Sequence, residues 1–152
     1  MSTGLAIFDA TVQETNGWLI DAAERLGGGG RHDAYTAVRA GLHALRDRLP
    51  AEMVLALSAQ LPMLLRGLFL EGWRLADTPT NERTIRAFAD KVEAELPPDY
   101  PHDGETVARA VFKVLAGRVG GGLPEKLVLH LPEELRELWP ASPLVSAPTG
   151  WA

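Results

Sequence analysis

The chain has 152 residues, carries a formal net charge of −5, and is 46% hydrophobic and 23% charged, with no cysteine. This composition is typical of one soluble globular domain, and the absence of thiols excludes disulfides, thiolate catalysis and cysteine-ligated metal sites. The negative charge argues against nucleic-acid binding and against docking on anionic lipid, because both need a basic surface.

The N-terminal residues 1–5 have neither the basic region nor the long apolar region of a signal peptide. The longest apolar stretches are far shorter than the ~20 residues that span a bilayer. We therefore expect a cytoplasmic protein without a membrane-spanning segment.

Apolar residues at spacings of three and four predict helices from the start of the chain. The first covers residues 5–26 and ends at the glycine run 27–30, because consecutive glycines disfavour a helix. The second runs to about Leu49, and Asp33 is expected to be its N-cap. A short third helix follows from Pro50 to near residue 60, since proline suits the first turn of a helix.

A fourth helix, residues 62–75, is apolar nearly all round. Such a helix is either central in the fold or covered by a partner. The sequence therefore predicts a partner surface on this helix, made by Met63, Leu64, Gly67, Phe69, Leu70 and Trp73.

The second half of the chain predicts the same order of elements. A fifth helix is expected from an N-cap at Thr80 to Leu96, and a sixth from an N-cap at Asp103 to Val119. Two short helices are then expected to begin at Pro124 and Pro132. Residues 141–152 lack periodicity and are predicted to form a tail.

The two halves are related by an internal duplication with an offset of 70 residues. Aligning residues 32–69 with 102–139 without a gap gives 13 identities in 38 positions, which marks a repeat. Because no segment alternates with period two, we predict an all-α fold with two tandem four-helix repeats, about 8–75 and 78–140. We expect the repeats to pack as one pseudo-two-fold helical bundle in a single domain, residues 1–140.

In the first half of the chain LRDRLP at residues 45–50 is followed by QLP at 60–62 and LRGL at 65–68, and the second half contains LPEELRELW at 131–139. In combination they resemble the bacterial domain-of-unknown-function family DUF2267, over roughly residues 8–140. The resemblance implies an all-helical, internally duplicated protein and brings no activity, cofactor or catalytic residue. The chain departs from the family pattern at Met63 and Leu64 and in its glycine runs.

Two His-Asp pairs, His32–Asp33 and His102–Asp103, occupy matching positions of the repeats. If they met at the pseudo-two-fold axis, their imidazoles and carboxylates could bind a divalent metal. Paired helix capping by the aspartates explains the repetition without a metal. His130 has no counterpart in the first repeat, where Gln60 stands, and is interpreted as a helix-end residue that bonds a carbonyl.

Other candidate motifs have structural interpretations. The glycine runs 27–30 and 120–122 lack the Lys-Ser/Thr of a phosphate-binding loop and are interpreted as connectors. Arg39, Arg46 and Arg48 are interpreted as a solvated helix face. The repeated arginines are expected to bridge to acids or helix carbonyls, at Arg48, Arg118, Arg66 and Arg136.

No catalytic constellation and no cofactor motif emerges from this sequence. The leading hypothesis is a non-enzymatic helical module of unknown function that binds a protein partner or self-associates. The alternative hypothesis is a protein that binds a small ligand or a divalent metal at a site between the repeats.

Overall fold

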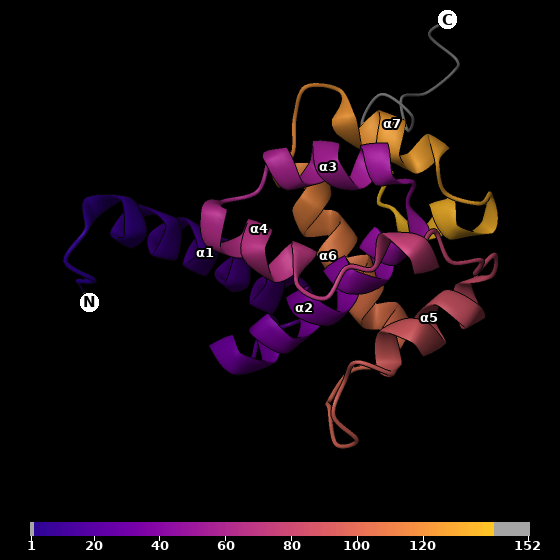
Figure 1. Ribbon diagram of the computed structural model, residues 1–152. Helices are drawn as coiled ribbons and strands as arrows, with labels where there is room; N and C mark the ends of the chain where they lie inside the picture. Colours follow the sequence, from indigo (N-terminus) through magenta and orange to yellow (C-terminus); the bar gives the residue numbers. More distant parts are fainter. Residues whose placement is uncertain (1, 142–152) are drawn as a thin grey trace, which may run out of the picture.

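The computed structural model describes residues 2–141, and within this range all regular elements are helices and no strand is present (Figure 1). The all-α prediction is confirmed. The predicted tail lies outside the described residues except for Ala141. The α-helices are α1 (Ala6–Arg25), α2 (Arg31–Arg48), α3 (Ala51–Ala59), α4 (Met63–Leu70), α5 (Ile85–Glu93), α6 (Gly104–Arg118) and α7 (Leu123–Leu129), and the 3₁₀ helices are η1 (Leu75–Asp77) and η2 (Glu134–Leu138).

The centre of the fold is formed by α2 and α6, which pack against each other and against both α1 and α5. A close approach of the two backbones explains one glycine, because a Cβ on Gly41 would lie 2.7 Å from Cγ2 of Val111. The central position of α2 was not predicted, since its polar residues include His43 and Arg46, which are both buried. By contrast, α4 lies at the periphery and buries only one edge, Leu65 and Phe69.

An aromatic cluster forms the core beside α5, α6 and η2. The Phe88 and Phe112 rings lie 5.9 Å apart, and the Phe112 and Trp139 rings lie 5.2 Å apart. Both phenylalanines are fully buried, as is Phe69 of α4. Tilted aromatic pairs at this spacing add to the burial of apolar area, so these contacts anchor the C-terminal elements to the central helices.

The two predicted aspartate caps have different outcomes. Asp103 caps α6, because its Oδ1 accepts a hydrogen bond from the Thr106 amide at 2.8 Å. Hydrogen bonding with Thr106, through its side chain first and its amide second, lowers the pKa of the Asp103 carboxyl. The prediction for Asp33 is wrong, because α2 begins at Arg31 and its N-cap is Gly30. Gly30, at the end of the glycine turn, has an extended backbone and is the N-cap, so the helix begins at Arg31, two residues before Asp33. Asp33 therefore lies in the first turn, where a negative charge suits the helix dipole.

The predicted N-cap at Thr80 is also wrong. The α5 helix begins at Ile85, and its cap is Thr84, which accepts from the Ala87 amide at 3.0 Å. Thr80 instead joins the loop to α2, since its amide donates to the Asp47 carbonyl at 2.7 Å. A tertiary hydrogen bond thus holds this segment extended.

The fourth and eighth helices are shorter than predicted. The α4 helix ends at Leu70, and Gly72 then adopts a left-handed conformation with φ of 75°, which stops a helix. The eighth element is the 3₁₀ helix η2 rather than an α-helix. Pro140 follows closely and disfavours helical geometry in the preceding residue, so only a short, tightly wound segment forms.

Candidate partner surface

The N-terminal end of α1 extends beyond the body of the molecule (Figure 1). We name residues 5–12 the α1 arm. Its large apolar residues are exposed, and Phe8 lies three and seven residues before Thr11 and Thr15, which are buried. Phe8 therefore continues the stripe by which α1 packs on the core, past the point where the core ends.

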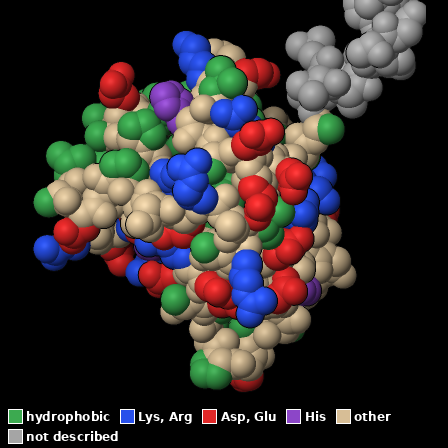
Figure 2. All heavy atoms as spheres, turned by 90° about the vertical axis from the view of Figure 1, so that its right-hand side faces the viewer, with side chains coloured by type: hydrophobic (Ala, Val, Ile, Leu, Met, Phe, Trp, Pro, Cys, Tyr) green, Lys and Arg blue, Asp and Glu red, His purple; other side chains and the backbone are tan. Residues whose placement is uncertain are grey.

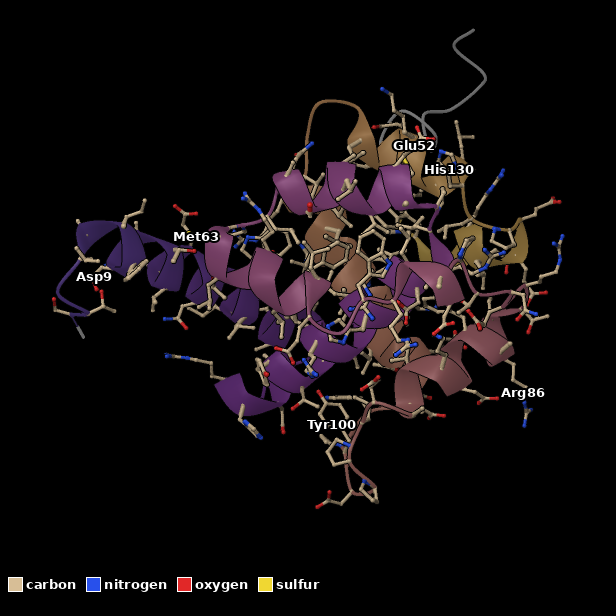
Figure 3. The ribbon with its side chains drawn as sticks, viewed as in Figure 1. Asp9, Glu52, Met63, Arg86, Tyr100 and His130 are labelled. Atoms are coloured by element: carbon tan, nitrogen blue, oxygen red, sulfur yellow. The ribbon has the colours of Figure 1, made fainter. Side chains whose placement is uncertain are left out.

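The beginning of α4 lies beside the arm (Figure 3). The Leu64 amide donates to Thr11 Oγ1 at 2.9 Å, which fixes the two helices together. Met63 and Leu64 are both exposed. Six side chains that are 36–64% exposed therefore gather at this end of the molecule, and we name them the apolar cluster: Leu5, Ile7, Phe8, Val12, Met63 and Leu64.

The partner surface predicted from the sequence is divided in the structure. Met63, Leu64 and Gly67 are exposed, whereas Leu70 and Trp73 are partly buried. Phe69 is fully buried within this chain and belongs to the core. Its inclusion in a partner surface is therefore corrected. The α1 arm contributes most of the exposed apolar residues at this end, although its exposure was not predicted.

A buried cation and a buried imidazole hold the C-terminal end of α4. Arg46 is only 5% exposed, and its Nη1 donates to the carbonyls of Phe69 at 3.0 Å and Glu71 at 2.8 Å. His43 Nε2 lies 2.7 Å from the Leu68 carbonyl, and since a carbonyl only accepts, Nε2 carries the proton. These donors satisfy carbonyls that a helix end leaves without partners.

Burial is the main cause that lowers the pKa of His43, and the cations of Arg46 and Arg39 lower it further. The hydrogen bond to Leu68 and the charge of Glu95 act in the opposite direction. His43 is therefore a neutral donor in the folded protein at neutral pH.

The interpretation of Arg39, Arg46 and Arg48 as a solvated face is wrong. Arg46 is buried and also pairs with Asp47 at 2.8 Å, and Arg48 Nε donates to the Glu82 carbonyl at 2.7 Å. The signal was present in the sequence, because Arg46 lies four residues after Leu42 in the buried stripe of α2.

The repeated arginines do bridge to carbonyls and acids, as predicted. Arg66 donates to the Ser58 and Leu61 carbonyls at 2.9 and 3.1 Å, and Arg136 donates to those of Leu131 and Leu129 at 3.0 and 3.3 Å. Arg118 joins α6 to α1, since it donates to Asp21 and to the Gly17 carbonyl, both at 3.0 Å, and lies over the Trp18 ring.

The His-Asp pairs make structural contacts. His32 stacks on Tyr35, and His102 packs edge-on against Tyr100. The Tyr100 hydroxyl donates to the Asp33 carbonyl at 2.6 Å, and burial raises the pKa of Tyr100 to about 12. Within residues 2–141 no group of three or more His, Asp or Glu side chains could hold a metal ion. The metal hypothesis therefore gains no support.

His130 is the C-cap residue of α7, and its side chain is exposed. Its counterpart Gln60 instead holds the second glycine run in place, since it donates to the Gly120 carbonyl and accepts from the Gly120 amide, each at 2.9 Å. Gly27, Gly28, Gly29, Gly121 and Gly122 have positive φ, which agrees with their interpretation as connectors.

Two open grooves mark the surface. One, of about 430 Å³, lies between α5 and the start of α6. Among its acidic residues, Asp103 caps α6 and Glu93 accepts from the Gly104 amide at 3.2 Å. The other, of about 370 Å³, lies between the C-terminal half of α1 and the glycine turn, and its lining residues are Leu19, Ile20, Ala23, Glu24, Gly28, Gly29 and Arg31.

The face turned away from the α1 arm has a different character. Figure 2 shows acidic and basic side chains intermixed on this face. No helix within residues 2–141 combines the length and apolar character needed to cross a bilayer. Of the large apolar side chains that are exposed within residues 2–141, six lie in the apolar cluster, whereas Leu55, Leu75 and Leu129 lie on other elements.

The sequence profile of the family described as "Uncharacterized conserved protein (DUF2267)" matches residues 15–138. The chain belongs to the DUF2267 family. This confirms the resemblance seen in the repeated motifs. No curated protein matches this DUF2267 chain. The family match begins at residue 15, so the α1 arm lies outside the matched residues.

Proposed function

We propose that this DUF2267 protein is a non-enzymatic helical module that binds a protein partner through the apolar cluster. The observation that carries this proposal is the concentration of six exposed large apolar side chains on two neighbouring elements. Together they expose a few hundred Å² of apolar surface, comparable with the largest patch on a typical soluble monomer, about 300–600 Å², and such a patch is often functional.

We also propose that the fold consists of two tandem repeats related by a pseudo-two-fold, packed as one domain. Gly41 and Val111 are equivalent under the 70-residue offset and touch each other, as residues near a two-fold axis do. The equivalent helices α1 and α5 each pack on both α2 and α6. Comparing equivalent positions of the two repeats therefore identifies the features that occur in only one of them.

The apolar cluster is such a feature, which supports its assignment to binding. The α5 helix begins at Ile85, which corresponds to Thr15, so the second repeat has no arm. Met63 and Leu64 correspond to Glu133 and Glu134. The second repeat therefore folds without either half of the cluster, and stability of a repeat does not require it.

The test is quantitative capture from the native cell with matched variants. We expect a partner that binds the wild type and is lost with Leu64→Glu, while Leu129→Glu retains it. Leu129 is 68% exposed and lies on α7, outside the cluster, so it controls for the added charge. Partners that bind all three proteins equally would refute an interaction through the cluster.

A further inference from the structure

The exposed side of α1 carries an apolar line that continues from the arm to the opposite end of the helix. Its members recur at spacings of three and four, which places them on one side of the helix. Ile20 is 53% exposed, although it lies far from the arm. Asn16 is the only polar residue in the line: Leu5, Phe8, Val12, Asn16, Ile20 and Ala23.

The far end of this line forms one wall of the 370 Å³ groove. Ile20 and Ala23 line it from α1, and Gly28 and Gly29 form its opposite side. The same helix therefore carries the exposed apolar arm at one end and the apolar wall of an open groove at the other. The arm cannot fill the groove of its own chain, because Phe8 and Ile20 are about 18 Å apart along a rigid helix.

We propose that the occupant is a second copy of this chain, with two α1 helices packed antiparallel about a two-fold axis so that each arm lies in the groove of the other copy. This rests on the proposed function and names its partner. A two-fold axis makes each contact occur twice. In the register that sets Phe8 opposite Ile20 of the second copy, Leu5 faces Ala23 and Val12 faces Asn16.

Charge favours the antiparallel arrangement over the parallel one. The α1 helix has Asp9 beside Phe8 in its first half, and no Lys or Arg precedes Arg25. A parallel pair would set Asp9 beside Asp9 of the second copy and would align the two helix dipoles. The antiparallel pair instead brings the arm toward the groove, whose rim carries Arg31 beside Glu24.

The buried area suits a weak, reversible dimer. The exposed parts of Leu5, Phe8, Val12 and Ile20 amount to roughly 300 Å² in each copy, taking about 150–250 Å² for a large side chain. With the flanking polar atoms, the two copies together bury on the order of 1,000 Å², near the lower limit of a specific interface. Association in the micromolar range or weaker is therefore expected.

Because the chain contains no cysteine, engineered cysteines report the register directly. Phe8→Cys combined with Ile20→Cys is expected to give a disulfide-linked dimer under mild oxidation, since a disulfide requires Cα atoms closer than ~7 Å. Phe8→Cys alone and Ile20→Cys alone are expected to stay monomeric, because in this register equal positions of the two copies lie far apart. Cross-linking of either single variant as efficient as that of the double variant would overturn the antiparallel register.

The oligomeric state gives the second measurement, by sedimentation or light scattering over a concentration series. Wild type is expected to dimerise, Phe8→Glu to associate at least about tenfold more weakly, and Leu129→Glu to behave as wild type. Phe8→Glu combined with Ile20→Lys is expected to restore dimerisation, since the register pairs the two new charges. Both positions are exposed, and circular dichroism checks that each variant is folded.

A wild type that stays monomeric up to millimolar concentration would overturn this inference, as would a dimer that Phe8→Glu leaves intact. If the wild type is monomeric but a different protein is captured and lost with Leu64→Glu, only the identity of the partner is refuted. If the chain dimerises as described and Leu64→Glu loses no partner, the dimer stands and the proposed role of Met63 and Leu64 in binding fails.

Discussion

Replacing Arg46 with Met should destabilise the protein by about 3 kcal/mol. Arg46 is 5% exposed and donates from one nitrogen to the carbonyls of Phe69 and Glu71. Hydrogen bonds from a charged donor each contribute about 1.5–3 kcal/mol. Methionine preserves most of the apolar packing and leaves both carbonyls without this donor. The partial exposure of Asp47 and its second cation, Lys91 at 3.7 Å, limit the cost of the lost ion pair.

Urea unfolding at pH 7 measures this loss, with Arg39→Met as the matched control. Arg39 is on the same helix and pairs with Glu71 at 3.4 Å, but Glu71 is mostly exposed, so its removal should cost less than about 1 kcal/mol. Arg46→Lys should lie between the two, because lysine retains the charge but lacks the planar guanidinium. Equal losses for Arg46→Met and Arg39→Met would refute the assignment of Arg46 as the anchor of α4.

Four further substitutions test the packing, a hydrogen bond and the pH dependence of stability. Gly41→Ala should destabilise the protein by about 1–2 kcal/mol, because the added Cβ would meet Val111. In Gly67→Ala the added Cβ meets nothing within 4 Å, so this substitution should stabilise the protein by about 0.5–1 kcal/mol through helix propensity. Urea unfolding of both variants compares the two effects. Tyr100→Phe removes the hydrogen bond to the Asp33 carbonyl and should cost about 1 kcal/mol in the same assay. Because burial lowers the pKa of His43 in the folded state, the unfolded chain binds the proton more readily, and stability should fall as pH decreases below about 6.5. His43→Gln keeps an amide donor and should lose this part of the pH dependence of the melting temperature. A pH profile that is the same in His43→Gln and wild type would contradict this role of His43.

The helices were predictable from the sequence because apolar spacing and proline position mark them directly. The ends of the helices were less predictable. Asp33 and Asp103 occupy equivalent positions, yet only Asp103 is an N-cap. The difference arises from the preceding loops, one rich in glycine and one in proline. After the first loop the helix begins two residues before Asp33, whereas after the second it begins one residue after Asp103. Local capping preferences alone do not contain that information.

The burial of α2 was harder to predict than its helicity. Its sequence contains Arg39, His43, Arg46 and Arg48, so hydrophobicity assigns these residues to water. The partners of His43, Arg46 and Arg48 are carbonyls at the end of α4 and in the loop before α5, more than 20 residues away in the chain. Only the tertiary arrangement shows that these donors bind buried backbone carbonyls, which would otherwise have no hydrogen-bond partner.

The candidate surface was predicted only in part, for a related reason. The apolar character of α4 was visible, but Phe8 and Val12 belong to the same spacing pattern as the buried residues of α1. Periodicity identifies an apolar stripe but not where the core beneath it ends. The length of α1 beyond α2 and α6 decides that Phe8 is exposed while Trp18 is buried.

Under the two-repeat organisation proposed above, one pair of equivalent positions, Leu64 and Glu134, accounts for an arm in the first repeat only. In the second repeat Glu134 accepts a hydrogen bond from the Ile85 amide at 2.6 Å, which satisfies a free donor at the start of α5. The equivalent residue in the first repeat is Leu64, which has no carboxylate, and its own amide donates instead to Thr11. The α1 helix begins at Ala6, nine residues before Thr15, the counterpart of Ile85, so the Thr15 amide lies inside the helix and is satisfied by the helix backbone. Leu64 has no carboxylate that could accept from a helix amide, and its side chain belongs to the apolar cluster. One position is thus linked both to the exposed arm and to the exposed edge of α4.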